Sequence, residues 1–191
     1  MLLGILSDTH GHVGRTASAI SILRTLSAGA FVHCGDVGGE PILELLAGTG
    51  AWFVWGNTDH PEPGLVAAAR ALGLKPPEES PVRLELDGRR FAVYHGHEPG
   101  FEQLAGWIRQ QRADRLAARL RGMDYVLFGH THEATDLRVG GTRFINPGAL
   151  KRAAVPSVAT LDPASDELRF WAVPNSWSAG LTPRELHIRH G

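Results

Sequence analysis

The chain has 191 residues, 19 basic against 20 acidic side chains, ten histidines and a single cysteine, Cys34. This length fits one domain with a full hydrophobic core. The near-zero net charge argues against wholesale binding to nucleic acid or to an anionic membrane. One cysteine excludes an internal disulfide and a thiolate metal cluster. Because the first residues match no signal peptide and no apolar run reaches about 18 residues, we expect a cytoplasmic protein without a membrane partner.

The first third of the chain alternates short apolar runs with segments of helical spacing. The runs are typical of buried parallel strands, and a glycine or proline punctuates each helical segment. The expected strands are 2–7, 31–34 and 51–55, and the expected helices are 13–26, 41–46 and 65–72. This order predicts parallel strands covered by helices.

The rest of the chain is predicted to form mostly antiparallel strands. Asp87-Gly88 is a strong hairpin signal between strands 82–86 and 90–94, and a long amphipathic helix is expected over 101–121. Further strands follow at 125–128, 135–139, 142–145, 157–161 and 167–173. Two facing sheets with helices outside would bury these faces. We expect one domain over 1–173, with 174–191 as its C-terminal extension. The arginines of the long helix form a solvated face or, less favoured, steer a phosphate substrate.

Five polar clusters directly follow predicted strands. In open α/β sheets, ligands bind beyond the carboxyl ends of the strands, so these clusters should converge on one edge. Nearby glycines would let the backbone approach an ion or phosphate closely. The converging side chains are Asp8, His10, Asp36, Asn57, His95, His130 and His132.

This set holds oxygen and imidazole donors and no sulfur. Such donors suit a divalent ion such as Mn, Fe, Co, Ni or Zn. Seven side chains exceed what one ion takes from a protein, and they fit two ions about 3.5–4 Å apart that share a bridging carboxylate. The sequence therefore predicts a binuclear metal centre.

The motifs that carry these residues resemble the calcineurin-like metallophosphoesterase signature. They are Ser7-Asp8-Thr9-His10-Gly11, His33-Cys34-Gly35-Asp36, Gly56-Asn57-Thr58-Asp59, His95-Gly96-His97, Gly129-His130-Thr131-His132 and Asn146-Pro147-Gly148. The match spans about residues 2–173, and the compact size resembles the small, single-domain YfcE-like phosphodiesterase branch.

The resemblance implies an α/β fold, a four-layer α/β/β/α sandwich of two mixed sheets. It also implies a manganese-type centre in which Asp8, His10 and His132 hold one ion, Asn57, His95 and His130 hold the other, and Asp36 bridges. The expected activity is hydrolysis of a small phosphodiester by metal-bound hydroxide.

Three further residues are predicted to support catalysis: His12, Asp59 and His97. Asp59 and His97, together with His33, are candidates for orienting the ligands. For His33, a satisfied, part-buried histidine is an equal alternative, and His12 either touches the substrate phosphate or is simply exposed. The wider superfamily often has a histidine where this chain has Thr58. Threonine is no general acid near neutral pH, so the proton donor is left open among His12, His60, His97 and a bound water.

Several alternatives remain beside the diesterase. A phosphomonoesterase or nucleotidase would use the same site. A non-catalytic protein-binding scaffold of the same fold is disfavoured, because such scaffolds lack some metal ligands and all seven are present here. The charge balance disfavours a nuclease with a stable nucleic-acid partner. Trp55 and Trp107 either line a substrate pocket or pack in the core. A homo-oligomer is compatible with the sequence.

Overall fold

A computed structural model describes residues 1–110, 112–178 and 180–188. One sheet, sheet A, has the strand order β11-β10-β9-β1-β2-β3. Its strands are β1 (Leu3–Leu6), β2 (Ala30–His33), β3 (Trp52–Phe53), β9 (Ser157–Asp162), β10 (Glu167–Ala172) and β11 (Glu185–Leu186). The first three run parallel, whereas β9 pairs antiparallel with β1. The intervening helices are α1 (Val13–Thr25), α2 (Glu40–Ala47) and α3 (Pro63–Ala71).

The second sheet, sheet B, has the order β4-β5-β6-β8-β7. Its strands are β4 (Val82–Leu86), β5 (Arg89–Val93), β6 (Tyr125–Leu127), β7 (Ala134–Val139) and β8 (Thr142–Pro147). The three central strands β5, β6 and β8 are parallel, and antiparallel strands flank them. Two helices, α4 (Pro99–Arg109) and α5 (Ala113–Arg119), lie between β5 and β6 in the chain.

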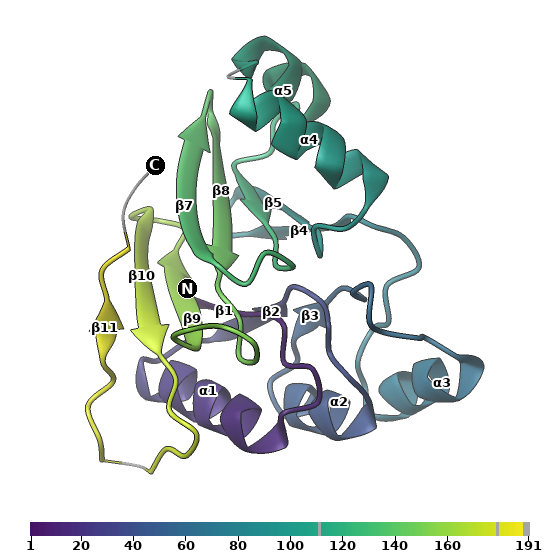
Figure 1. Cartoon of the computed structure of the whole chain (residues 1–191), viewed down its shortest axis with the longest axis vertical. Helices are drawn as coiled ribbons and strands as arrows, with labels where there is room; N and C mark the ends of the chain where they lie inside the picture. Colours follow the sequence, from purple (N-terminus) through teal and green to yellow (C-terminus); the bar gives the residue numbers. More distant parts are fainter. Residues whose placement is uncertain (111, 179, 189–191) are drawn as a thin grey trace.

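Three apolar clusters show how the elements stack. One lies between α1–α3 and sheet A, around Leu23, Leu43 and Phe53. A second joins the two sheets around Ile5 and Phe91. The third cluster, which includes Leu104, Leu116 and Phe144, packs α4 and α5 on sheet B. Figure 1 shows the resulting order, with α1–α3 beyond one sheet and α4–α5 beyond the other. The expected sandwich of two mixed sheets between helical layers is confirmed.

The prediction of one long helix over 101–121 is wrong, because the segment forms the two helices α4 and α5. At their junction Arg112 N–H donates to Trp107 O, five residues back, and the Arg112 guanidinium pairs with Asp114. A straight 21-residue helix would extend about 30 Å. The bend instead lets Leu104, Leu116 and Leu120 enter one cluster above the short strands of sheet B.

The tail beyond residue 173 is not wholly loose. Its strand β11 pairs with β10 and extends the edge of sheet A. Residues 179 and 189–191 of the tail lie outside the described residues, and the proposed division at residue 173 stays a prediction. Among the helices of the described ranges, none is long and apolar enough to cross a membrane.

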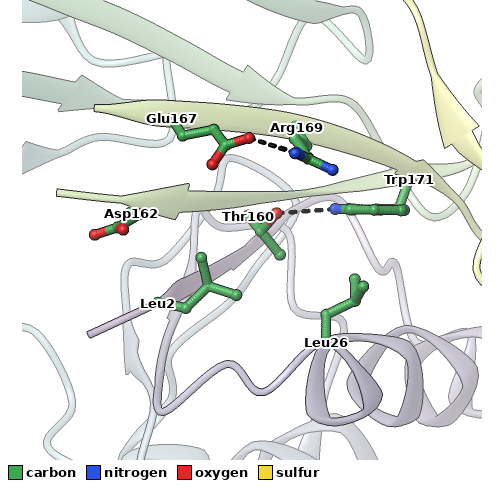
Figure 2. Close-up of a pocket in the computed structure, with 7 residues that line it drawn as sticks. All are labelled: Leu2, Leu26, Thr160, Asp162, Glu167, Arg169 and Trp171. Carbon is green, nitrogen blue, oxygen red and sulfur yellow. Dashed lines mark hydrogen bonds and ion pairs between the residues drawn. The ribbon is translucent and has the colours of Figure 1, made fainter. Parts of the chain in front are cut away.

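The two ends of β1 carry different features. At its start, Leu2 contributes to a hollow of about 210 Å³ with Leu26, Thr160 and Trp171. Figure 2 shows Trp171 reaching across β9, where its indole N–H donates to Thr160 Oγ1 (2.9 Å). This hollow contains none of the predicted site residues. Those residues lie at the opposite end of the strand, where Asp8 follows β1.

Candidate metal centre

The predicted ligands converge on one edge of the sandwich. Asp8 and His10 follow β1, Asp36 follows β2, and Asn57 follows β3. His95 comes after β5, and His130 and His132 occupy the connection from β6 to β7. Backbone hydrogen bonds join these loops, from Asp8 N–H to Gly35 O (3.0 Å) and from Gly129 N–H to His95 O (2.8 Å). The convergence expected from strand ends is therefore present, across both sheets.

Asp8, His10 and His132, here called the first ligand group, lie on one side of the centre. His132 Nε2 is 3.1 Å from Asp8 Oδ1 and 3.5 Å from His10 Nε2. The His132 side chain is 23% exposed, whereas Asp8 is fully buried. One ligand atom from each of the three residues falls within 4.8 Å of the others, which is close enough to surround one ion.

Asn57, His95 and His130, the second ligand group, lie on the other side. The buried His95 ring has Asn57 Oδ1 at 3.0 Å from its Nε2. Its Nδ1 is 2.8 Å from Cys34 O, so the neutral ring donates there and presents an Nε2 lone pair to the centre. The His130 ring packs edge-on against His95, with centroids 5.1 Å apart.

Asp36 lies between the two groups. Its Oδ2 is 3.5 Å from His10 Nε2, and its Oδ1 is 3.5 Å from His95 Nε2. One carboxylate oxygen thus faces a histidine of the first group and the other faces a histidine of the second group, as a bridging carboxylate requires. Burial opposes ionisation of Asp36, but hydrogen bonding from Thr58 and the charges of His95 and His10 together hold the pKa below its usual value.

The backbone at the ligands is unusual. Asp8, His10, Asp36, His130 and His132 all have φ between 43° and 67°. This left-handed region is uncommon for residues with a Cβ, and such conformations persist only where the surroundings impose them. Five of the seven predicted ligands share it, so the loops hold their side chains in place through strained backbone.

Two glycines permit close approach of the loops, as the sequence suggested. A Cβ on Gly56 would lie 2.1 Å from Asp36 Oδ1, and one on Gly129 would lie 2.0 Å from Ser7 Oγ. Real Cβ atoms do not approach other atoms so closely. Any side chain at either position would displace a carboxylate of the centre or the hydroxyl that supports it.

The residues present fit a cation. Asp8 Oδ1 is buried and receives no hydrogen bond from the described residues. Burial, more than any opposing contact, raises the pKa of Asp8 to about 6, although the Ser7 hydroxyl donates to its other oxygen. A buried carboxylate is costly unless it is paired or coordinates a metal. His95 Nε2 lies 3.0 Å from Asn57 Oδ1 and 3.5 Å from Asp36 Oδ1, so lone pairs of three ligands are brought close together, as a cation would require.

Asp59 anchors two of the loops. Its Oδ2 accepts hydrogen bonds from the backbone N–H groups of Val37 (3.0 Å) and Gly56 (2.7 Å), and its Oδ1 accepts one from Gly38 N–H (2.8 Å). The carboxylate therefore joins the loop that follows β2 to the loop that carries Asn57. This placement is that of a positioning residue, as expected for one of its two roles; direct catalysis by Asp59 stays a prediction.

The buried His33 supports the loop that follows β2. Gly35 N–H donates to its Nδ1 (3.1 Å), so Nε2 carries the proton and faces Thr9 Oγ1 at 3.0 Å. Thr9 in turn donates to Val37 O (2.8 Å). Burial lowers the pKa of His33 to about 3, which keeps the ring neutral. Both sequence alternatives hold for His33, since it is a satisfied buried histidine and also fixes a ligand loop.

His12 and His97 occupy different places. His12 caps α1, where its Nδ1 accepts a hydrogen bond from Arg15 N–H (3.2 Å). The His97 ring centroid lies 5.3 Å from that of His95 and 6.3 Å from that of His130, and its side chain is 37% exposed. His97 therefore flanks the second ligand group, whereas His12 has a helix-capping contact. The catalytic roles of both stay predictions.

Sequence reasoning placed Glu98 only in a loop that could set substrate specificity and missed its support of the ligands. Its carboxylate accepts hydrogen bonds from the N–H groups of His95 (2.9 Å) and Gly96 (2.7 Å) and from the Ser80 hydroxyl (2.6 Å). Burial alone would raise the pKa of Glu98, but these bonds outweigh it and lower the pKa. Its position directly before Pro99, the first residue of α4, was the available signal for a residue that organises the loop.

Two cationic residues stand beside the first ligand group. Lys151 N–H donates to Asp8 O (3.1 Å), and its ammonium lies 3.4 Å from His10 O. Burial, aided by the charges of Arg152 and Lys151 and opposed by Asp36, holds the pKa of His10 below its usual value. Both cations are exposed, so they also face solvent at the mouth of the centre.

Comparison with known proteins finds relatives that are phosphoesterases. A model of the calcineurin-like phosphoesterase superfamily domain matches residues 1–166. The chain is 26% identical over 173 residues to phosphodiesterase MJ0936 of Methanocaldococcus jannaschii, covering 88% of this chain and 97% of that protein. An archaeal phosphodiesterase structure superposes with a TM-score of 0.73 at 25% identity, over 90% of this chain and 99% of that one. The E. coli phosphoesterase YfcE shares the fold, with a TM-score of 0.60 at 20% identity over 99% and 100%.

Proposed function

The chain belongs to the calcineurin-like phosphoesterase superfamily, in its small YfcE-like branch, and is a metal-dependent phosphoesterase; on this premise we propose that it is a binuclear phosphodiesterase. Its substrate is a small phosphodiester. Asp8, His10 and His132 hold one divalent ion, Asn57, His95 and His130 hold the second, and Asp36 bridges them. Manganese is the preferred ion, with Ni, Fe, Co and Zn as alternatives.

The observation that carries the proposal is the position of Asp36. Its two oxygens each lie 3.5 Å from the Nε2 atom of a different histidine, His10 on one side and His95 on the other. A carboxylate that served a single ion would have no reason to face both groups. When bound, a pair of divalent ions lowers the pKa of a water between them and offsets charge on the phosphate.

The chain's own residues position that chemistry. Asp59 and Glu98 fix the loops that carry Asp36, Asn57 and His95 through hydrogen bonds to backbone N–H groups. The Nδ1–H of His95 is held by Cys34 O, which keeps Nε2 directed at the centre. Lys151 and Arg152 supply positive charge where an anionic phosphate would approach the first ligand group.

Thr58 supports a diester over a monoester. It stands in the Asn57 loop, where its N–H donates to Asp36 Oδ1 (2.9 Å) and its hydroxyl lies 3.4 Å from His10 Nδ1. A threonine cannot protonate a leaving alkoxide near neutral pH, so activated leaving groups should react best. His97 and His12 remain candidates for contact with the substrate, and a cytoplasmic location remains part of the proposal.

The test combines metal analysis with an assay of paired substrates. Bound metal is counted by mass spectrometry, and turnover of bis(p-nitrophenyl) phosphate and p-nitrophenyl phosphate is measured with added manganese or nickel. We expect about two ions per chain and faster turnover of the diester. Faster turnover of the monoester would favour a monoesterase on the same site. No turnover of either substrate with both metal positions filled would reject the enzymatic proposal for these substrate classes.

Asp36→Ala tests the bridge. We expect the metal count to fall to about one or less and kcat/KM to fall roughly 10³-fold, because a bridging ligand serves both ions. Asp114→Ala is the matched control, because Asp114 is an exposed aspartate on α5 that pairs with Arg112. Two ions retained in Asp36→Ala would show that the bridging assignment is wrong.

A further inference from the structure

A pocket lies beside the second ligand group. Its volume is about 320 Å³, and Trp55, Pro61 and Pro77 give it apolar walls. Glu78, Glu79 and Glu98 add carboxylates to the lining. A cavity with aromatic and aliphatic walls and a few polar groups is typical of a site that holds an organic group.

The pocket adjoins the metal centre, although none of the seven predicted ligands lines it. Gly56 lines it, and the next residue along the chain is Asn57 of the second ligand group. His97 also lines it, with its ring centroid 5.3 Å from the His95 ring and 6.3 Å from the His130 ring. A phosphorus atom held at the centre would therefore place one ester substituent at the mouth of this pocket.

The charge of the lining selects among substituents. Three glutamates and no lysine or arginine occur among the described residues that line the pocket. Arg70 approaches Glu78 at 4.0 Å, but both side chains are largely exposed and such pairs contribute little. Hydrogen bonds from two backbone N–H groups and a hydroxyl hold the Glu98 carboxylate in place. A second phosphate or a carboxylate would meet like charge here, whereas a cation would meet carboxylates and an indole ring.

The opposite side of the centre carries positive charge. Lys151 and Arg152 stand beside the first ligand group. A substrate with an anionic phosphodiester and a cationic arm would match this gradient, with the arm directed away from the two basic residues.

We propose that the pocket formed by Trp55, Pro61, Pro77, Glu78, Glu79 and Glu98 binds one ester arm of the substrate, and that this arm carries an ammonium group. Indole faces and carboxylates together attract quaternary or primary ammonium ions. The proposal rests on the phosphodiesterase function and narrows its substrate class to diesters of amino alcohols.

The experiment compares two diesters that differ by one charge. The first is p-nitrophenyl phosphocholine, and the second is p-nitrophenyl 3,3-dimethylbutyl phosphate, in which carbon replaces the quaternary nitrogen. The leaving group and shape are the same in both. With the metal-loaded full chain, we expect kcat/KM to favour the choline ester roughly five- to tenfold, as one cation–π contact would give.

Binding supplies a readout that does not need turnover. Calorimetry with phosphocholine and 3,3-dimethylbutyl phosphate should show the same preference in Kd. If neither diester is hydrolysed but phosphocholine still binds more tightly, the diesterase function fails and the pocket assignment stands. If both diesters are hydrolysed and neither readout shows a preference for the ammonium compound, the pocket assignment is wrong and the function stands.

Two variants locate the preference. Glu79→Gln and Trp55→Leu should each move the ratio of the two kcat/KM values toward one. Glu44→Gln removes a comparable exposed glutamate from α2, outside the pocket, and should leave the ratio unchanged. Because Trp55 also packs edge-on against Phe53, thermal melting must show that Trp55→Leu is folded. A preference that survives both pocket variants would mean that the ammonium group binds elsewhere.

Discussion

The two ligand groups of the centre use similar side chains but are held differently. The second group is built around His95, whose side chain is fully buried and whose Nδ1 is fixed by Cys34 O at 2.8 Å. The first group includes His132, which is 23% exposed, and His10, whose Nδ1 lies 3.4 Å from Thr58 Oγ1. Ligands whose orientation is fixed by neighbours bind metal more tightly. Asn57 and His130 of the second group are exposed, so the contrast is between single ligands. We therefore expect the loss of His95 to weaken ion binding more than the loss of His132.

The comparison is tested most directly by removing one histidine from each group. His95→Ala should lower kcat/KM roughly 10³-fold, because a buried and preorganised ligand is gone. The value of kcat/KM should stay low even at millimolar manganese. His132→Ala should recover much of its activity as manganese is raised. Metal titrations followed by activity and by calorimetry measure both. Equal metal dependence in the two variants would show that the two histidines contribute equally to ion binding.

A second test inserts a methyl group beside the bridge. A Cβ on Gly56 would meet Asp36 Oδ1 at 2.1 Å, whereas one on Gly64, in α3, has nothing within 4 Å. Gly56→Ala should destabilise the fold by about 1–3 kcal/mol through overpacking and should reduce metal occupancy. Gly64→Ala should be neutral or slightly stabilising. Chemical denaturation and metal analysis compare the two, and a fully metallated, stable Gly56→Ala protein would contradict the close approach.

The positioning role of Asp59 predicts a smaller loss. Asp59→Asn places an amide where three backbone N–H groups now donate, so at least one donor loses its acceptor. We expect metal affinity to fall about 10- to 100-fold, as when other supporting groups are removed. Saturating metal should then restore most of kcat. If kcat stays low with both ions bound, Asp59 acts in the chemical step.

The smallest effect is expected at the basic rim of the first group. Arg152→Ala should raise KM for an anionic diester about two- to fivefold at low salt, because an exposed charge acts mainly by steering. The difference from wild type should shrink as ionic strength rises. Arg121→Ala, an exposed arginine beyond α5, is the control. A salt-independent increase in KM would instead indicate direct contact of Arg152 with the substrate.

Much of the centre could be predicted from the sequence because each ligand is marked by the residues directly before it. Each ligand directly follows a short apolar strand, and strand ends of parallel sheets converge by geometry. The roles of Asp59 and Glu98 depend on which backbone N–H groups meet their carboxylates in three dimensions. Gly-x-x-Asp and Glu-Pro are common in ordinary turns, so Asp59 could be predicted only as a candidate and the support that Glu98 gives to the ligands could not be predicted.

The division of the helix over 101–121 was hidden for a related reason. The apolar spacing continues on both sides of the junction, from Leu104 to Leu116 and Leu120, and no proline or glycine marks the break at Arg112. The bend places residues of both helices in one apolar cluster on sheet B. A local pattern can report a helical face without reporting the curvature of the layer that it covers.

The left-handed backbone of five ligands has a consequence for stability. Glycine adopts such conformations more readily than aspartate or histidine. A glycine at His132, for example, would relieve local strain while removing a ligand. We infer that the loops that hold these ligands are the least stable region of the metal-free chain. Ion binding then compensates for part of the strain. Hydrogen exchange in the metal-free protein should then open first in the loops beyond β1, β2 and β6, while the strands that lead into them stay protected.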